Sequence, residues 1–203
     1  MTARERLNQL KEKFGPAIQR ADLPGDSRLF AYVEPATLKA VCQYLFRELD
    51  ARYVISIGLD DRPFSGKFLV AHNFAFDRDR LLCSMLAHLP ADHPEVDSIA
   101  PAVPGANWAE REFRELVGIE LRGHPYPKRL VLPDGWPDGV HPLRKDVPWN
   151  QVPADFDENA EFTFDDPPAG CTVVPFGPFH PTLDEPEHFR LYVEGEMVRG
   201  CEY

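Results

Sequence analysis

The stretch EREFRELVGIELRGHPYPKRLVL, residues 110–132, begins with a helical pattern and ends as a basic, proline-containing extended segment. A helix is expected to begin at an Asn107 N-cap and to stop at Gly118. Its buried stripe is predicted at Ala109, Phe113, Leu116 and Val117. The stretch contains no Cys, no glycine-rich phosphate loop and no nucleophile–base pair, so it predicts no active site of its own.

Charged residues occupy the rest of this predicted helix. Glu110–Arg114 and Arg111–Glu115 are spaced i,i+4 and are expected to form ion pairs along it. Glu110, Arg111 and Glu112 could act as an acid–base group, but three charges on one helix are more often a solvated face. We favour a third interpretation, in which they make charge-assisted contacts with a partner protein.

The residues before this stretch predict alternating helices and strands. Helices are expected at 3–14 and 35–49, strands at 27–33, 52–61 and 67–76, and a strand or short helix at 81–89. Short polar loops between the strands favour antiparallel pairing over the crossovers of a nucleotide-binding sheet. We therefore predict an α+β domain over residues 1–120, with helices on one face of a mostly antiparallel sheet.

The remainder of the chain differs in composition. Thirteen of the 21 prolines follow residue 123, which predicts a long extended strap, with the family-like part at 121–150. Between Asp146 and His188 there are ten acidic residues and no Lys or Arg, so this stretch supplies −10 of the net charge of −11. Such a run disfavours nucleic-acid binding, and we interpret 151–172 as a solvated acidic linker. A long segment without its own core indicates a protein partner.

The cysteines and the hydropathy pattern exclude several classes of function. No CxxC occurs, and no histidine stands at zinc spacing from Cys42, Cys83, Cys171 or Cys201. No metal or iron–sulfur site is therefore expected from this chain alone. No apolar run approaches 20 residues, and the first residues show no signal-peptide pattern. We expect any membrane association to run through a partner.

A family resemblance emerges at residues 106–148. They resemble the signature region of the 30-kDa subunit of respiratory complex I, NADH:quinone oxidoreductase. The matching positions are Glu110-Arg111-Glu112, Glu115-Leu116-Val117, His124, Lys128, Leu130-Val131 and the element HPLRKDVP at 141–148. In the family pattern Asp is usual at the position of Glu115, and an aromatic residue is common at that of Val117.

Residues 173–203 resemble the beginning of a second protein, the 49-kDa-type subunit of complex I or the homologous large subunit of membrane-bound [NiFe] hydrogenases. The match rests on Gly177, Pro178, His180 and Pro181. A second histidine of the complex I pattern is absent here, as in the formate-hydrogenlyase branch, where the two subunits are often fused. We expect this chain to be the 30-kDa-like half of such a fusion, ending just inside the large-subunit half.

The resemblance assigns partner contacts to particular residues. We expect an interface at Glu110, Arg111, Glu112, His124, Lys128, Arg129, His141, Arg144 and Lys145. For the two histidines the alternative is a solvent-facing turn, and Arg144 and Lys145 could instead pair within the chain. Apolar anchors are expected at Trp108, Phe113, Trp136 and Trp149, with core packing as the alternative. His180 is the one residue placed near a quinone.

The resemblance implies a non-catalytic structural subunit that docks on the 49-kDa-type subunit, on the cytoplasmic face of the membrane. Iron–sulfur clusters, flavin or nickel are expected only in partner subunits. One alternative is the N-terminal domain of an energy-converting [NiFe] hydrogenase large subunit. Others are a stand-alone protein-binding adaptor and an independent enzyme, for which no pocket of convergent titratable groups is evident. Residues 150–203 are expected to be mobile when the chain is isolated.

Overall fold

The computed structural model describes residues 1–160 and 164–202 and divides the chain into two compact units, Met1–Asn159 and Ala160–Tyr203. Residues 161–163, inside the predicted acidic linker, and residue 203 lie outside the described residues.

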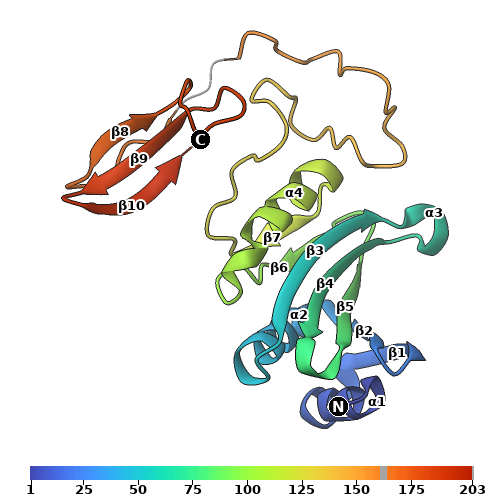
Figure 1. Ribbon diagram of the computed structural model, residues 1–203. Coiled ribbons are helices and arrows are strands. Elements are labelled where there is room, and N and C mark those ends of the chain that lie inside the picture. The colour runs from blue at the N-terminus through green and yellow to red at the C-terminus, as the bar shows by residue number, and fades with distance from the viewer. Residues whose placement is uncertain (161–163, 203) are drawn as a thin grey trace. The chain divides into compact units, whose positions relative to one another are not determined.

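A five-stranded mixed sheet organises the first unit, in the order β1-β2-β5-β4-β3 (Figure 1). Its strands are β1 (Ile18–Gly25), β2 (Arg28–Val33), β3 (Arg52–Asp60), β4 (Phe68–Phe76) and β5 (Leu81–Leu89). Neighbouring strands are antiparallel except β2 and β5, which are parallel. The predicted α+β class is confirmed, and the segment with two possible states at 81–89 is a strand.

Three helices bury their apolar sides in the core of this unit. They are α1 (Ala3–Phe14), α2 (Pro35–Gln43) and α4 (Asn107–Val117). A capping box of Thr2 and Glu5 closes the first turn of α1. The helix predicted at 35–49 is regular only as far as Gln43, where α2 ends, and a π-helical turn at Tyr44–Glu48 continues it. The shorter elements are Gly15–Ala17, α3 (Arg62–Ser65), Asp77–Asp79, Pro104–Ala106, and the parallel pair β6 (Glu95–Asp97) and β7 (Glu120–Arg122).

The core follows the alternation of the strands. Phe68, Val70, Phe74 and Phe76 of β4 are buried with the odd-numbered residues of β5, and they share one cluster with the apolar sides of the helices. The even-numbered residues of β5 and the odd-numbered residues of β4 point to the other side of the sheet. We call these two sides the inner face and the outer face.

α4 packs on β3 through a close approach. A Cβ atom added to Gly58 would lie 2.5 Å from the Cβ of Phe113, so this strand position requires glycine. Gly118 ends the helix in the left-handed region, as predicted. The predicted N-cap is wrong by one residue, because Ala106 precedes the helix and Asn107 is its first residue. The short helix at Pro104–Ala106 leads directly into α4, so no side-chain cap is needed there.

The segment between β7 and β8 is not a long extended strap. Its described residues form turns without a helix or a strand, as the prolines predict, but the chain folds back on α4. The cause is a set of charged side chains on and near α4 that bind its backbone, and these form the candidate site. β1 was also not expected, because its sequence IQRADLPG is polar and ends near a proline.

The second unit is a three-stranded antiparallel sheet in the order β10-β9-β8. Its strands are β8 (Thr172–Phe176), β9 (Phe189–Glu194) and β10 (Met197–Glu202). The carboxylate of Glu202 accepts hydrogen bonds from the Tyr192 hydroxyl and the Asp165 amide.

Candidate functional site

Glu115, on α4, binds the backbone of the segment that carries the family-like motif. Its carboxylate accepts hydrogen bonds from the amides of Leu130 at 2.9 Å, Val131 at 3.0 Å and Leu132. The residue is 9% exposed, so these three amides are held in a largely dry environment. Because these are charge-assisted hydrogen bonds to backbone amides, Glu115 fixes the backbone of residues 130–132.

Arg111 lies one helical turn before Glu115 and binds backbone carbonyl groups of the same segment, whereas Glu115 binds amide groups. Its Nε donates to the Lys128 carbonyl at 2.8 Å, and its Nη2 donates to the Arg129 carbonyl. Its guanidinium also lies 5.0 Å from the centre of the Tyr126 ring. Arg111 and Glu115 therefore form a clamp, in which the arginine binds backbone carbonyls and the glutamate binds backbone amides. We refer to them as the α4 clamp.

Glu110 is fully buried and holds a different loop. It accepts hydrogen bonds from the Ser98 hydroxyl at 2.5 Å and from the Ile99 amide at 2.8 Å. Burial raises the pKa of this carboxyl group, and these hydrogen bonds partly oppose that rise. The alternative of a solvated charged face is therefore wrong for Glu110 and Arg111. The predicted ion pairs Glu110–Arg114 and Arg111–Glu115 do not form among the described residues.

His124 is buried beside Glu110. Its Nδ1 accepts from the Tyr126 amide at 3.1 Å, so the neutral ring carries its proton on Nε2 and donates to the Asn107 carbonyl at 3.2 Å. Burial lowers the pKa of His124. This position corrects the alternative of a solvent-facing turn histidine, and the ring fixes the beginning of the 121–150 segment against α4.

The element HPLRKDVP caps the C-terminal end of α4. His141 Nδ1 donates to the Glu115 carbonyl at 2.8 Å, and the Leu143 amide donates to Leu116 at 2.9 Å. Arg144 donates to the carbonyls of Val117 at 2.8 Å and Gly118 at 3.1 Å. The terminal carbonyls that an α-helix leaves unpaired are thus satisfied from outside the helix. A side chain at Gly118 would collide with His141 and Arg144.

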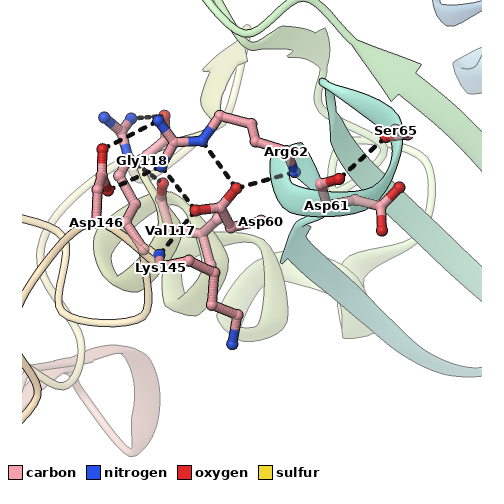
Figure 2. Close-up of polar contacts among 9 residues, drawn as sticks. Asp60, Asp61, Arg62, Ser65, Val117, Gly118, Lys145 and Asp146 are labelled. Atoms are coloured by element: carbon pink, nitrogen blue, oxygen red, sulfur yellow. Dashed lines mark hydrogen bonds and ion pairs between the residues drawn. The ribbon is translucent and has the colours of Figure 1, made fainter.

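A carboxylate network secures the same element to β3. Arg62 binds Asp60 through two hydrogen bonds, at 2.8 and 2.7 Å, and Asp146 through two more, at 3.1 and 2.8 Å. The Lys145 amide donates to Asp60 at 2.8 Å (Figure 2). The side chain of Asp60 is fully buried, and the hydrogen bonds from Arg62 hold its pKa well below the usual value. Asp60 and Arg62 were not predicted as site residues from the sequence, where their only signal is a charged triplet at the end of the strand predicted at 52–61.

The other predicted interface residues keep more solvent contact. Glu112 and the Lys145 side chain are exposed. Arg129 donates to Asp138 at 2.7 Å within the segment, and Lys128 lies 5.4 Å from the Tyr126 ring.

The predicted anchors divide into core and surface. Phe113 is 4% exposed, so the core alternative is confirmed for it. Trp136 is half-buried against Phe156, with ring centres 6.2 Å apart. Trp149 is 89% exposed and Trp108 is 59% exposed, so both present apolar surface to solvent.

His180 belongs to the second unit and is exposed. Its Nδ1 lies 2.8 Å from the Thr182 hydroxyl, and its ring centre lies 4.1 Å from that of Phe176.

Two features are not found in the described part of the chain. It contains no group of three or more His, Cys, Asp or Glu residues placed to hold a metal ion. None of its helices is both long enough and apolar enough to cross a membrane. The geometry instead presents a shaped surface, in which buried charges hold a segment whose apolar side chains are exposed.

Comparison with known proteins identifies the family. The family described as "Respiratory-chain NADH dehydrogenase, 30 Kd subunit" matches residues 31–153. The chain is 36% identical over 201 residues to "Formate hydrogenlyase subunit 5" of Escherichia coli (strain K12), covering 97% of this chain and 35% of that protein. It is 30% identical over 162 residues to the C/D subunit of the NADH-quinone oxidoreductase of Rhodopseudomonas palustris (strain BisB18), covering 73% and 27%.

The chain belongs to the family of the 30-kDa subunit of complex I. It spans about a third of the length of these curated relatives. The solved structure of the "membrane-bound sulfane sulfur reductase (MBS), an archaeal respiratory membrane complex" has the same fold, with a TM-score of 0.56 at 17% identity, covering 72% of this chain and 86% of that one.

Proposed function

We propose that this chain is a non-catalytic structural part of the peripheral arm of a complex I-like oxidoreductase, at the cytoplasmic face of the membrane. Its 121–150 segment docks on the 49-kDa-type large subunit, and redox cofactors reside in partner subunits. Family membership supports this role, and so does the fusion of C and D subunits that a relative's name records.

The observation that carries the proposal is the exposure of apolar side chains on a segment with a fixed backbone. Val131 is 57% exposed and Leu143 is 55% exposed, although the amides of both residues are bound by α4. Trp149 is 89% exposed a few residues further on. Apolar groups held rigidly in water lose little conformational entropy on binding and suit a protein interface.

Among the predicted interface residues we assign two roles. Glu112, Lys128, Arg129 and Lys145 are proposed to contact the large subunit directly. The buried or half-buried ones are proposed to set the shape of the segment that docks: Glu110, Arg111, His124, His141 and Arg144. On this assignment, the buried charges affect docking through the conformation of the backbone.

The hydrogenase branch is favoured by one comparison. The match to formate hydrogenlyase subunit 5 extends over 97% of the chain, whereas only 73% of it matches the C/D subunit. We therefore propose, as the second candidate, that residues 173–203 begin a large-subunit region of the energy-converting hydrogenase type. On the quinone-reductase alternative, His180 lies near the quinone, and a His180→Ala variant raises the KM for quinone.

Purification through a tag on residues 1–150 tests the docking proposal, after cleavage at a protease site inserted at 151–172, so that the test also holds for a fused polypeptide. The double variant Leu143→Ser with Trp149→Ser is expected to lose the large subunit at moderate salt. Phe64→Ser is the matched control, because Phe64 is 88% exposed on α3, outside the 121–150 segment. Equal recovery of the large subunit from both proteins would contradict docking through this segment and favour an adaptor with another partner.

A further inference from the structure

The outer face of the five-stranded sheet carries a run of apolar side chains on β3, where a solvent-facing strand is usually polar, while the neighbouring strands place Asn73, Ser84 and His88 on the same face. In the register of the strands, Ile57 of β3 lies beside Ala71 of β4, which lies beside Leu86 of β5 and then Tyr32 of β2. In the next row towards one edge, Leu59 lies beside Leu69. An antiparallel sheet with one wet face alternates apolar and polar residues, and β3 does not follow this rule.

The β3 side chains of this face are open to solvent. Ile55 is 44% exposed, Ile57 is 48% exposed and Leu59 is 42% exposed. The buried side chains of α1, α2 and α4 belong to the core on the inner face. Within the described residues, these three helices therefore do not bury Ile55, Ile57 and Leu59. Three adjacent outward β-branched or leucine side chains on an edge strand form a patch of the kind that marks an interaction site.

One end of the outer face is basic. Arg28 of β2, Leu82 of β5, Ala75 of β4 and Arg52 of β3 form a single row across the sheet. Arg52 is neutralised by Asp77, which it binds through two hydrogen bonds of 2.8 Å. The side chain of Arg28 makes no hydrogen bond or ion pair within the part of the chain that the structure describes.

Arg80 adds a second unpaired guanidinium at the same end. It lines one shallow hollow with Arg28, Ser27 and Asp77, and its side chain likewise has no polar partner among the described residues. Its φ of 52° lies in the left-handed region, where glycine or asparagine would be less strained. Two exposed guanidinium groups beside one hollow present N–H donors whose geometry matches carboxylates.

We propose that the outer face of the sheet is a second docking surface. Its occupant is a segment of a partner protein with apolar side chains against Ile55, Ile57 and Leu59 and with carboxylates against Arg28 and Arg80. Charge complementarity selects an acidic protein segment. An anionic membrane is a poorer fit, because lipid-binding sites gather four or more basic residues and Asp77 sits within this end of the face.

This surface is separate from the docking segment at 121–150, so the two proposals fail separately. The test uses the full encoded polypeptide in its purified complex. A photoreactive phenylalanine analogue replaces Ile57, and in a matched control it replaces Phe64, which is 88% exposed on α3. Irradiation at Ile57 is expected to yield one dominant cross-linked partner peptide that carries apolar residues and at least two acidic ones, and the Phe64 probe is expected not to yield it.

Charge reversal completes the test. Arg28→Glu is expected to reduce recovery of the cross-linked partner at least tenfold without changing recovery of the large subunit. Changing the acidic residues of the cross-linked peptide to Lys is expected to restore it. Ile57→Asp is expected to act as Arg28→Glu does, while Phe64→Asp has no effect, with urea midpoints confirming that each variant folds.

Three results would overturn the proposal. One is equal cross-linking from Ile57 and Phe64, and another is a dominant peptide without acidic residues. The third is binding of the complex to phosphatidylglycerol vesicles that Arg28→Glu abolishes, which would assign the face to a lipid surface.

Discussion

The inner face of the sheet and the 121–150 segment are held by different forces. On the inner face, Phe68 and Phe74 are fully buried among other apolar side chains, and their contribution comes from removing apolar area from water. The 121–150 segment keeps Val131 and Leu143 in water. Charged side chains fix it to α4 in both directions: Glu115 of α4 accepts from the Val131 amide, and Arg144 of the segment donates to the Val117 carbonyl. The inner face is thus stabilised by burial of apolar side chains. The 121–150 segment has its backbone fixed by hydrogen bonds, while its apolar side chains remain exposed to solvent.

The largest expected effect is on the core. Phe74→Ala removes a fully buried aromatic side chain that packs edge-on against Tyr53, at 5.8 Å between ring centres. The free energy of unfolding of the first unit is expected to fall by about 3–5 kcal/mol. Urea denaturation followed by circular dichroism measures it. A loss below about 1 kcal/mol would mean that the inner face is not the principal core.

Breaking the α4 clamp is expected to act locally. Glu115→Ala removes the acceptor of three amides, and the opening free energy of residues 130–132 is expected to fall by about 3 kcal/mol. Amide hydrogen exchange measures this, while amides of β4 and β5 keep their protection. Glu112→Ala, on an exposed position of the same helix, is the control. Uniform loss of protection across both regions would remove the distinction between them.

The network at Asp60 is expected to be worth about 2 kcal/mol at neutral pH, measured as the difference in unfolding free energy between Asp60→Asn and the unaltered chain. Because the folded-state pKa of Asp60 is depressed, this contribution is present above the ordinary carboxyl value of 3.8. It is lost as pH falls from there through the folded pKa. The two proteins are therefore expected to converge in stability in acid. Asp61→Asn serves as the control, and a difference that persists unchanged at pH 2 would contradict the assignment.

The smallest effect at neutral pH is expected at His72. Its Nδ1 contacts the Ser56 hydroxyl at 2.7 Å, but its buried Nε2 has no partner among the described residues, so His72→Leu is expected to change stability by about 1 kcal/mol or less. Burial lowers the pKa of His72 to about 3, from an ordinary 6.5. As pH falls between these values only the unfolded chain takes up the proton, so stability is lost.

The measurement is the slope of unfolding free energy against pH. Below pH 6 the unaltered chain is expected to show a slope steeper by up to about 1.4 kcal/mol per pH unit than His72→Leu. Equal slopes would mean that the ring is protonated in the folded state.

Periodicity predicted several regular elements of the core, but it did not predict β1 and left 81–89 open between strand and helix. Spacing predicted β4 as a strand and α4 as a helix, and Gly118 was identifiable as a helix end. Of the predicted α4 stripe, Phe113 and Val117 are buried, whereas Ala109 and Leu116 are half-buried. The family-like motif includes Arg111, Glu115, His124 and His141, which make intrachain contacts around α4.

Spacing could not show where charged side chains would point. Arg111 and Glu115 have the i,i+4 spacing of an ordinary surface ion pair, yet both bind backbone groups some 15 residues away. Asp60 and Lys145 lie 85 positions apart, and no local signal links them. The sequence therefore predicted a strap without the contacts that fold it back, since these depend on tertiary proximity.

Amide hydrogen exchange on the chain alone and within its purified complex tests the central claim most directly. The account predicts that amides 130–132 are protected in both states, because α4 holds them, and that protection near Trp149 appears only in the complex. Free exchange of amides 130–132 in the isolated chain would show that the segment is shaped by its partner. Unchanged exchange near Trp149 in the complex would show that its exposed apolar side chain is not an interface.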